Sequence, residues 1–199
     1  MPNWCESVYV IEGPKEDLDA LDKIMTSLKQ MEKPLVENGF GVWWCGCIVA
    51  ILGGNTQEIY CRGEVIDYSY EAGVIKMQIE SAWSELKEFR LFLLKKLPKL
   101  KFYYQSEEPG MCVFTTNDKD GRYFPEKWLL DYNDEAKNLY IYEYFKDLPA
   151  VKEYLKNNGV LTKDVFPSKG AITAALDEIL EERPDDISYM LEEFVVVDC

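Results

Sequence analysis

The strongest constraint on the fold is a pair of alternating apolar and polar runs that meet at one glycine turn. In residues 66–71, apolar and aromatic side chains occupy every second position, and residues 75–80 repeat the pattern. Ala72-Gly73 separates the two runs. Period-two alternation on both sides of a short turn is typical of an antiparallel β-hairpin with one buried face. We therefore expect a sheet packed against a core in the first half of the chain.

Two amphipathic segments flank this hairpin. Gly13-Pro14 precedes a stretch with apolar residues at every third or fourth position and an acidic first turn, which predicts a helix with one buried face. Ser84 is expected to cap a second helix, which Pro98 ends. The predicted buried positions are Leu18, Leu21, Met25, Leu28 and Met31 in the first helix, and Leu86, Phe89, Leu93 and Leu97 in the second.

Two further strands complete the pattern, at residues 7–11 and 100–104. The order strand, helix, strand, strand, helix, strand predicts an α+β fold of the ferredoxin-like kind, a split βαβ antiparallel sheet with helices on one face. Residues 111–116 and 122–124 flank a polar turn and predict a second hairpin. Residues 42–52 are apolar on both faces, and their pattern fits a central strand as well as a buried helical turn.

The C-terminal part of the chain has a different character. Asp147-Leu148-Pro149 is expected to cap a helix ending at Asn158-Gly159, and Ser168 is expected to start another. A short element follows through Phe194. We therefore expect two parts, a ferredoxin-like domain over residues 1–135 and an acidic, mainly helical extension over residues 136–199.

Charge and composition limit the function. Lys and Arg number 22 against 36 Asp and Glu, for a formal net charge of −14. A field of that sign repels phosphate backbones and anionic membrane surfaces, so neither nucleic acid nor a membrane is expected as a partner. It serves solubility, or it favours a basic protein partner. The chain contains no histidine, which excludes Ser-His-Asp and Cys-His catalysis and histidine-ligated zinc.

The six cysteines are expected to be reduced thiols in the cytoplasm, because the chain opens without a signal-peptide pattern and no apolar run is long enough to span a bilayer. Cys45-Gly46-Cys47 would place two thiols on the same side of a strand. That spacing is not typical of structural zinc sites, and Cys5 and Cys61 are isolated. Buried thiols are the favoured interpretation over a metal or redox site, and no metal or cofactor is expected.

Three short motifs resemble a known family. The chain opens with Met1-Pro2-Asn3-Trp4-Cys5, carries Glu80-Ser81-Ala82-Trp83 before the second helix, and carries Glu107-Glu108-Pro109-Gly110-Met111 after the following strand. In this order and spacing they resemble the YubB-like, or Api-type, proteins of phages, plasmids and other mobile elements, which implies a ferredoxin-like domain of uncharacterised function. Members usually carry a tryptophan- and glycine-rich stretch before the central hairpin, where this chain has residues 61–65 without tryptophan.

These motifs supply the candidate site residues Asn3, Trp4, Trp83, Glu107 and Glu108. Each tryptophan is either buried at the end of the sheet or part of an aromatic ligand patch with the Glu107 turn. The adjacent carboxylates point to opposite faces of a strand, so they suit a solvated turn, a loop-fixing acid or a ligand contact better than paired acid catalysis.

Two functions follow from these observations. The favoured one is a non-enzymatic interaction or accessory protein of a mobile element, with an acidic surface for a basic partner. The alternative is a carboxylate- or thiol-dependent enzyme with a pocket near Trp4, Trp83 and Glu107. The sequence leaves the oligomeric state open.

Overall fold

The computed structural model describes residues 3–197, so Met1-Pro2 of the opening motif and Cys199 lie outside the described residues. The chain folds into two compact units, the first formed by Met1–Asp118 with Val196–Cys199 and the second by Lys119–Val195. Within residues 3–197, none of the helices has the length and hydrophobicity needed to cross a membrane.

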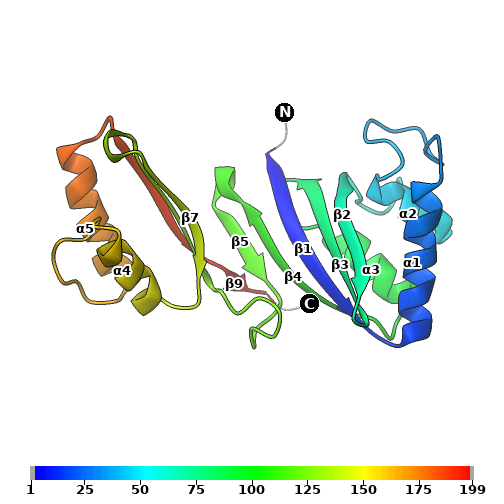
Figure 1. The fold of residues 1–199 in the computed structure, drawn as a ribbon. Coiled ribbons are helices and arrows are strands. Elements are labelled where there is room, and N and C mark those ends of the chain that lie inside the picture. The colour runs from blue at the N-terminus through cyan, green and yellow to red at the C-terminus, as the bar shows by residue number, and fades with distance from the viewer. Residues whose placement is uncertain (1–2, 198–199) are drawn as a thin grey trace. The chain divides into compact units, whose positions relative to one another are not determined.

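Five strands of the first unit and the short β9, which begins at the last residue of the second unit, form a six-stranded sheet in the order β2-β3-β1-β4-β5-β9 (Figure 1). Every pairing from β2 through β5 is antiparallel. The central strands alternate buried and exposed residues, as the sequence pattern predicts for a sheet with one face against a core. The strands are β1 (Trp4–Glu12), β2 (Gly63–Glu71), β3 (Val74–Ala82), β4 (Lys101–Glu108), β5 (Val113–Thr116) and β9 (Val195–Val196).

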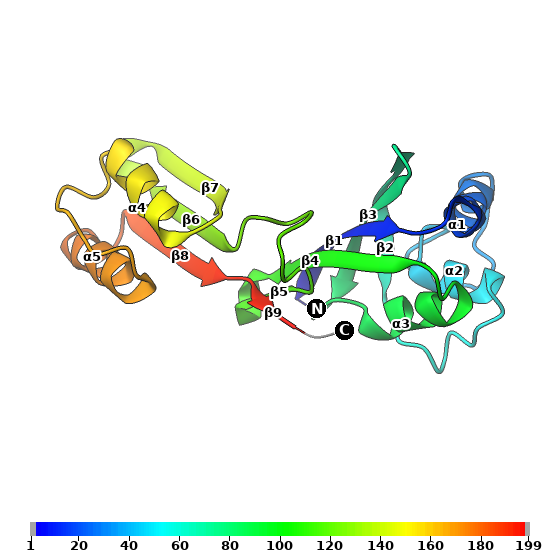
Figure 2. The same ribbon diagram turned by 90° about the horizontal axis from the view of Figure 1, so that it is seen from below.

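Helices α1 (Lys15–Lys29), α2 (Cys45–Ile51) and α3 (Lys87–Lys96) pack on one face of this sheet. Figure 2 shows them gathered at one side of β1 to β4. Their apolar faces share one core with alternate residues of the strands, among them Tyr9, Ile11 and Tyr104. The uncertain segment 42–52 is therefore helical in its centre, and Cys45 and Cys47 lie on a helix instead of a strand.

The predicted hairpin of β2 and β3 is confirmed, with one difference at its start. Ala72 and Gly73 both have positive φ angles, which suits a two-residue turn between antiparallel strands. A register shift between Val65 and Asp67 bulges Ile66 out of the ladder. As a result Val65 is buried, whereas Ile66, expected on the same face as Tyr68, is exposed.

Two other local predictions are wrong. Helix α3 begins at Lys87, because the chain is still turning at Ser84, whose N–H bonds to Ala82 and whose carbonyl accepts the hydroxyl of Ser81. Residues 122–124 form no strand, and β5 instead pairs with β4 across a short 3-10 turn, Pro109–Met111. Asn117 then closes the ladder by accepting from the Tyr104 N–H, at 2.7 Å.

The second unit is a three-stranded antiparallel sheet in the order β7-β6-β8, with two helices on one face (Figure 2). Asp147 and Ser168 cap the two helices, as predicted. The elements are β6 (Trp128–Asp134), a 3-10 turn (Glu135–Lys137), β7 (Leu139–Phe145), α4 (Leu148–Asn157), α5 (Lys169–Glu182) and β8 (Ile187–Glu193).

This unit differs from the expected helical extension. It begins at Lys119, before the predicted boundary at residue 135, because β6 is the central strand of its sheet and pairs with both β7 and β8. The element before Phe194 is the strand β8. Buried residues of β6, such as Leu130 and Tyr132, pack with α4 and α5, so this strand completes the second core.

Candidate interaction surface

The N-terminal motif and the motif before α3 meet at one end of the first sheet. The backbone N–H of Trp83 donates to the carbonyl of Asn3 over 2.9 Å, and Trp4 lies opposite Ala82 in the ladder of β1 and β3. A Cβ added at Gly110 would lie 2.7 Å from Asn3 Nδ2, so the turn after β4 also reaches this point. The structure thus brings Asn3, Trp83 and the Glu108-Gly110 turn together.

Glu108 fixes the turn after β4. Its side chain is buried, with the residue only 2% exposed, and accepts hydrogen bonds from the N–H groups of Gly110, at 2.9 Å, and Met111, at 2.7 Å. A carboxylate that receives two backbone donors at the start of a helical turn acts as its N-cap. Of the roles expected for Glu108, the loop-fixing one fits this geometry.

Trp83 is held in a strained conformation. Its φ is 74°, and the Ser84 N–H bonds to the Ala82 carbonyl at 3.0 Å, which closes a tight γ-turn around the tryptophan. A bulky residue with positive φ is uncommon, and such strain gathers at functional positions. The side chain is 42% exposed, so burial at the sheet end does not describe it.

Trp4 is also exposed, at 40%, and contacts a different loop. Its ring meets Phe40 edge to face, with centroids 6.1 Å apart. Successive residues of a strand point to opposite faces, so Trp4 and Glu6 lie on one face of β1 and Cys5 lies on the other. Helices α1, α2 and α3 pack against the Cys5 side and do not cover the face that carries Trp4 and Glu6. We call this uncovered face of β2-β3-β1-β4 the open face.

Glu107 belongs to a row of four glutamates across the open face, which we call the glutamate row. Glu6 on β1 is the direct partner of Glu80 on β3 and of Glu107 on β4, and Glu80 is in turn the partner of Glu64 on β2. Directly opposed residues in antiparallel strands have Cβ atoms about 4.5–5.5 Å apart. Four neighbouring strands therefore each contribute one carboxylate at the same level.

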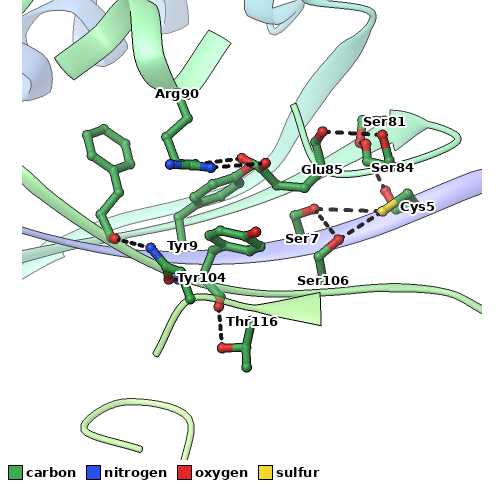
Figure 3. A network of polar contacts seen from close by, with 12 residues as sticks. Cys5, Ser7, Tyr9, Ser81, Ser84, Glu85, Arg90, Tyr104, Ser106 and Thr116 are labelled. Carbon is green, nitrogen blue, oxygen red and sulfur yellow. Dashed lines mark hydrogen bonds and ion pairs between the residues drawn. The ribbon is translucent and has the colours of Figure 1, made fainter. Parts of the chain in front are cut away.

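The covered face carries a buried polar network beneath the same sheet end (Figure 3). The hydroxyl of Ser7 donates to Ser106 at 3.1 Å, and the Cys5 sulfur lies 3.0 Å from the same Ser106 oxygen. Burial raises the pKa of the Cys5 thiol above its usual value. A thiol whose pKa is raised supplies little thiolate near neutral pH, so this cysteine is a poor nucleophile.

The same network joins α3 to the sheet (Figure 3). Glu85 accepts hydrogen bonds from the Tyr9 hydroxyl and from Arg90 Nε, both at 2.9 Å. The Arg90 guanidinium also lies 5.0 Å from the centre of the Tyr104 ring. Burial, followed by the neighbouring Glu85 carboxylate, raises the pKa of Tyr9 well above its usual value. With Arg90 and Glu85 shielded from solvent, this is an internal tether of α3 to β1 and β4.

Three further thiols, those of Cys45, Cys47 and Cys61, lie in the core of the first unit. Cys45, Cys47 and Cys61 are buried and free, and within residues 3–197 no three Cys, Asp or Glu side chains are grouped to hold a metal ion. Burial raises the pKa of Cys45 well above its usual value and that of Cys61 to about 11. These values fit thiols that serve as core residues.

Two cavities lie elsewhere in the first unit, each of about 420 Å³. The first lies between α1 and β2, around Met25, Trp43 and Tyr68. The second, which we call the aromatic cavity, is next to the Trp4 contact because Phe40 is part of its wall. It is lined by Asn38, Phe40, Trp44, Thr56, Gln57, Glu58, Ile59, Tyr60, Cys61, Arg62 and Glu88.

Sequence reasoning placed Glu107 in the candidate site but missed Glu6, Glu64 and Glu80. Alternation predicts that each points away from the core, yet only the pairing register shows that they are neighbours. Comparison of the chain with protein-family models, with curated proteins and with solved structures found no match. The assignment of a function therefore rests on the geometry described above.

Proposed function

We propose that this protein is a non-enzymatic interaction protein whose open face binds a lysine- and arginine-rich segment of another protein. The observation that carries the proposal is the glutamate row, in which four carboxylates stand side by side on four strands. In an extended segment lying across the strands, cations at every second position are about 6.6 Å apart, whereas neighbouring strands are about 4.8 Å apart, so about three cations would face the four glutamates. The net charge of −14 adds attraction at longer range.

The cost of the row supports a role in binding. Like charges directly opposite each other destabilise an antiparallel sheet. The row contains three such pairs, Glu64 with Glu80, Glu80 with Glu6, and Glu6 with Glu107. A local rule broken repeatedly at one place is expected where function outweighs stability.

The chemistry of the acids and thiols favours binding over catalysis. Glu108 is occupied in capping a turn, and burial raises the pKa of Cys5, Cys45 and Cys61. A carboxylate- or thiol-dependent enzyme needs a reactive and accessible group, and none of these four side chains is one. The buried free thiols are also compatible with the reducing cytoplasm as the working compartment.

The family and the finer fold class are part of the same proposal. The strand order β2-β3-β1-β4, antiparallel throughout, supports a ferredoxin-like arrangement of the first unit. The contacts of Asn3 with Trp83 and with the Gly110 turn support the resemblance to YubB-like proteins, because the three motifs are far apart in sequence and lie together at one end of the sheet. A basic host protein would then be the partner of a mobile-element accessory protein.

Fluorescence anisotropy of labelled decalysine tests the proposal. The wild-type protein should bind the peptide, and binding should weaken between about 50 and about 200 mM salt because exposed charges are screened. A variant with all four row residues changed to Gln should lose at least about fourfold in affinity, since each ion pair near the surface contributes roughly 0.2–1 kcal/mol.

A charge-matched variant supplies the control. Changing four exposed glutamates of the second unit to Gln produces the same formal net charge, −10 in place of −14, while the glutamate row stays intact. The residues for this control are Glu135, Glu153, Glu181 and Glu182. Equal affinity of the two variants for decalysine would show that net charge alone attracts the peptide, and the proposal would fail.

A further inference from the structure

We infer that the aromatic cavity receives one cationic side chain, a guanidinium or an ammonium group, from the basic segment that the glutamate row attracts. The inference rests on the proposed function and adds a specific recognition site to it. At about 420 Å³ the cavity is in the size range of ligand sites and is large enough for an arginine or lysine side chain.

The lining of the cavity suits an organic cation. Three aromatic residues form part of the wall, Phe40, Trp44 and Tyr60. The face of an aromatic ring attracts a cation through its quadrupole, and tryptophan does so most strongly. Aromatic side chains combined with carboxylates are the usual surroundings of a recognised guanidinium or ammonium group.

Two carboxylates give the lining of the cavity a net negative charge. Glu58 and Glu88 line it against a single cation, Arg62. Glu88 Oε2 accepts the Tyr60 N–H at 2.7 Å, and Glu58 Oε1 accepts the Asn55 amide at 2.8 Å. A carboxylate has about four acceptor positions, so both groups keep capacity for a cationic donor while these bonds fix their place.

The walls are held in position by contacts within the protein. The Trp44 ring lies over Gly46, where an added Cβ would be 2.3 Å from the ring. The Tyr60 hydroxyl donates to the Ala82 carbonyl at 3.2 Å, and Asn38 accepts the Phe40 N–H at 2.7 Å. A site whose walls are already in place loses less entropy when a ligand binds.

Two contacts link residues of the cavity lining to the strands that carry the glutamate row. Trp44 is the bridge partner of Glu64, the end of the row on β2. Phe40 meets the ring of Trp4, which shares the open face with Glu6. A basic segment lying along the row therefore has the cavity at its end, so one side chain can enter while its neighbours face the glutamates.

Titration with N-acetyl-arginine methylamide, followed by two-dimensional NMR, tests the inference. The chain has five tryptophans, and a Trp44→Phe variant assigns the indole N–H signal of Trp44 among them. The probe should shift this signal in a saturable manner. N-acetyl-citrulline methylamide has nearly the same shape without the charge and should leave the signal in place. A shift of equal size with both probes, or no shift with either, would overturn the inference.

The variant E58Q/E88Q provides the second readout. Both residues are exposed, and glutamine keeps an oxygen that can accept the Tyr60 and Asn55 donors. This variant should bind the arginine probe at least about twofold more weakly, because two exposed carboxylates no longer attract it. The matched control is E32Q/E37Q, in which two exposed acids outside the cavity lining are neutralised and binding should be unchanged. Equal weakening in both variants would contradict a charge-reading cavity.

The two proposals fail in different ways. If decalysine binding depends on the glutamate row but the arginine probe leaves the Trp44 signal unmoved, the function stands and the cavity has no part in it. If the arginine probe shifts the Trp44 signal but decalysine binds the row variant as tightly as the wild type, the cavity site is supported and the proposed function fails.

Discussion

The backbone N–H of Trp83 bonds to the carbonyl of Asn3, and this contact joins the residue before β1 to the strained residue after β3. Asn3 also lies against the turn that Glu108 caps. Three segments far apart in sequence are thereby held at one end of the sheet, beside the open face that carries the glutamate row.

Replacing Trp83 by glycine should stabilise the first unit relative to replacement by alanine. Both changes remove the exposed ring, but only glycine adopts a φ of 74° without steric cost. The difference should be about 1 kcal/mol, at the lower end of the usual cost of such strain. Urea unfolding of the two variants measures it, and an alanine variant as stable as the glycine variant would refute strain at this position.

Replacing Glu108 by alanine should destabilise the first unit by about 0.5–2 kcal/mol, because two backbone donors of the turn would lose the side chain that caps them. Glu107→Ala is the matched control on the neighbouring residue, which lies on the opposite face. Its effect on unfolding should be much smaller or stabilising. Similar losses in the two variants would mean that Glu108 does not act through the turn.

The row variant with Gln at all four positions should be more stable than the wild type at low salt. The repulsion within three opposed like-charge pairs is removed. The gain should shrink as salt is added, because exposed charges are screened over about 8 Å at physiological ionic strength. Urea unfolding at several salt concentrations checks this, and a loss of stability at low salt would contradict repulsion within the row.

The second unit should lose stability in acid through Asp134. The Arg183 guanidinium, which pairs with this fully buried carboxylate, holds its pKa below the usual value. Since the folded-state pKa is the lower one, the stabilisation is complete above the unfolded-state pKa of about 3.9 and is lost as the pH falls through the folded-state value. Arg183→Gln should therefore lower stability at pH 7 and flatten the acid dependence below pH 4. Amide exchange of β6 and β8 measures both effects, and an unchanged acid dependence would exclude this pair as the cause.

Local patterns predicted much of the first unit and the helix N-caps of the second unit. The hairpin, the buried faces of α1 and α3 and the caps at Asp147 and Ser168 follow from residues near each other in the chain. The failures involve longer-range competition. Residues 122–124 were expected to pair with residues 111–116, but β5 pairs with β4 instead. The boundary predicted at residue 135 placed β6, with Asp134, in the first domain. The pairing of β6 with β7 and β8 joins residues far apart in the chain, so no local sequence pattern indicates it.

The candidate site shows the same division. The motifs contain residues that meet in the structure, such as Asn3 and Trp83. They do not indicate the strained backbone of Trp83 or the exposure of Trp4 and Trp83. The glutamate row depends on the register of four strands, which a single sequence does not specify. Alternation alone places Glu6 and Glu80 on an outer face without placing them together.

The most direct test of the central claim is the map of amide NMR shifts that decalysine produces in the wild-type protein. The claim predicts that the largest shifts occur at Glu6 and Glu80, in the middle of the glutamate row, and fade as salt is added. Shifts that are spread evenly over the acidic residues of both units, or that centre on α5, would contradict it.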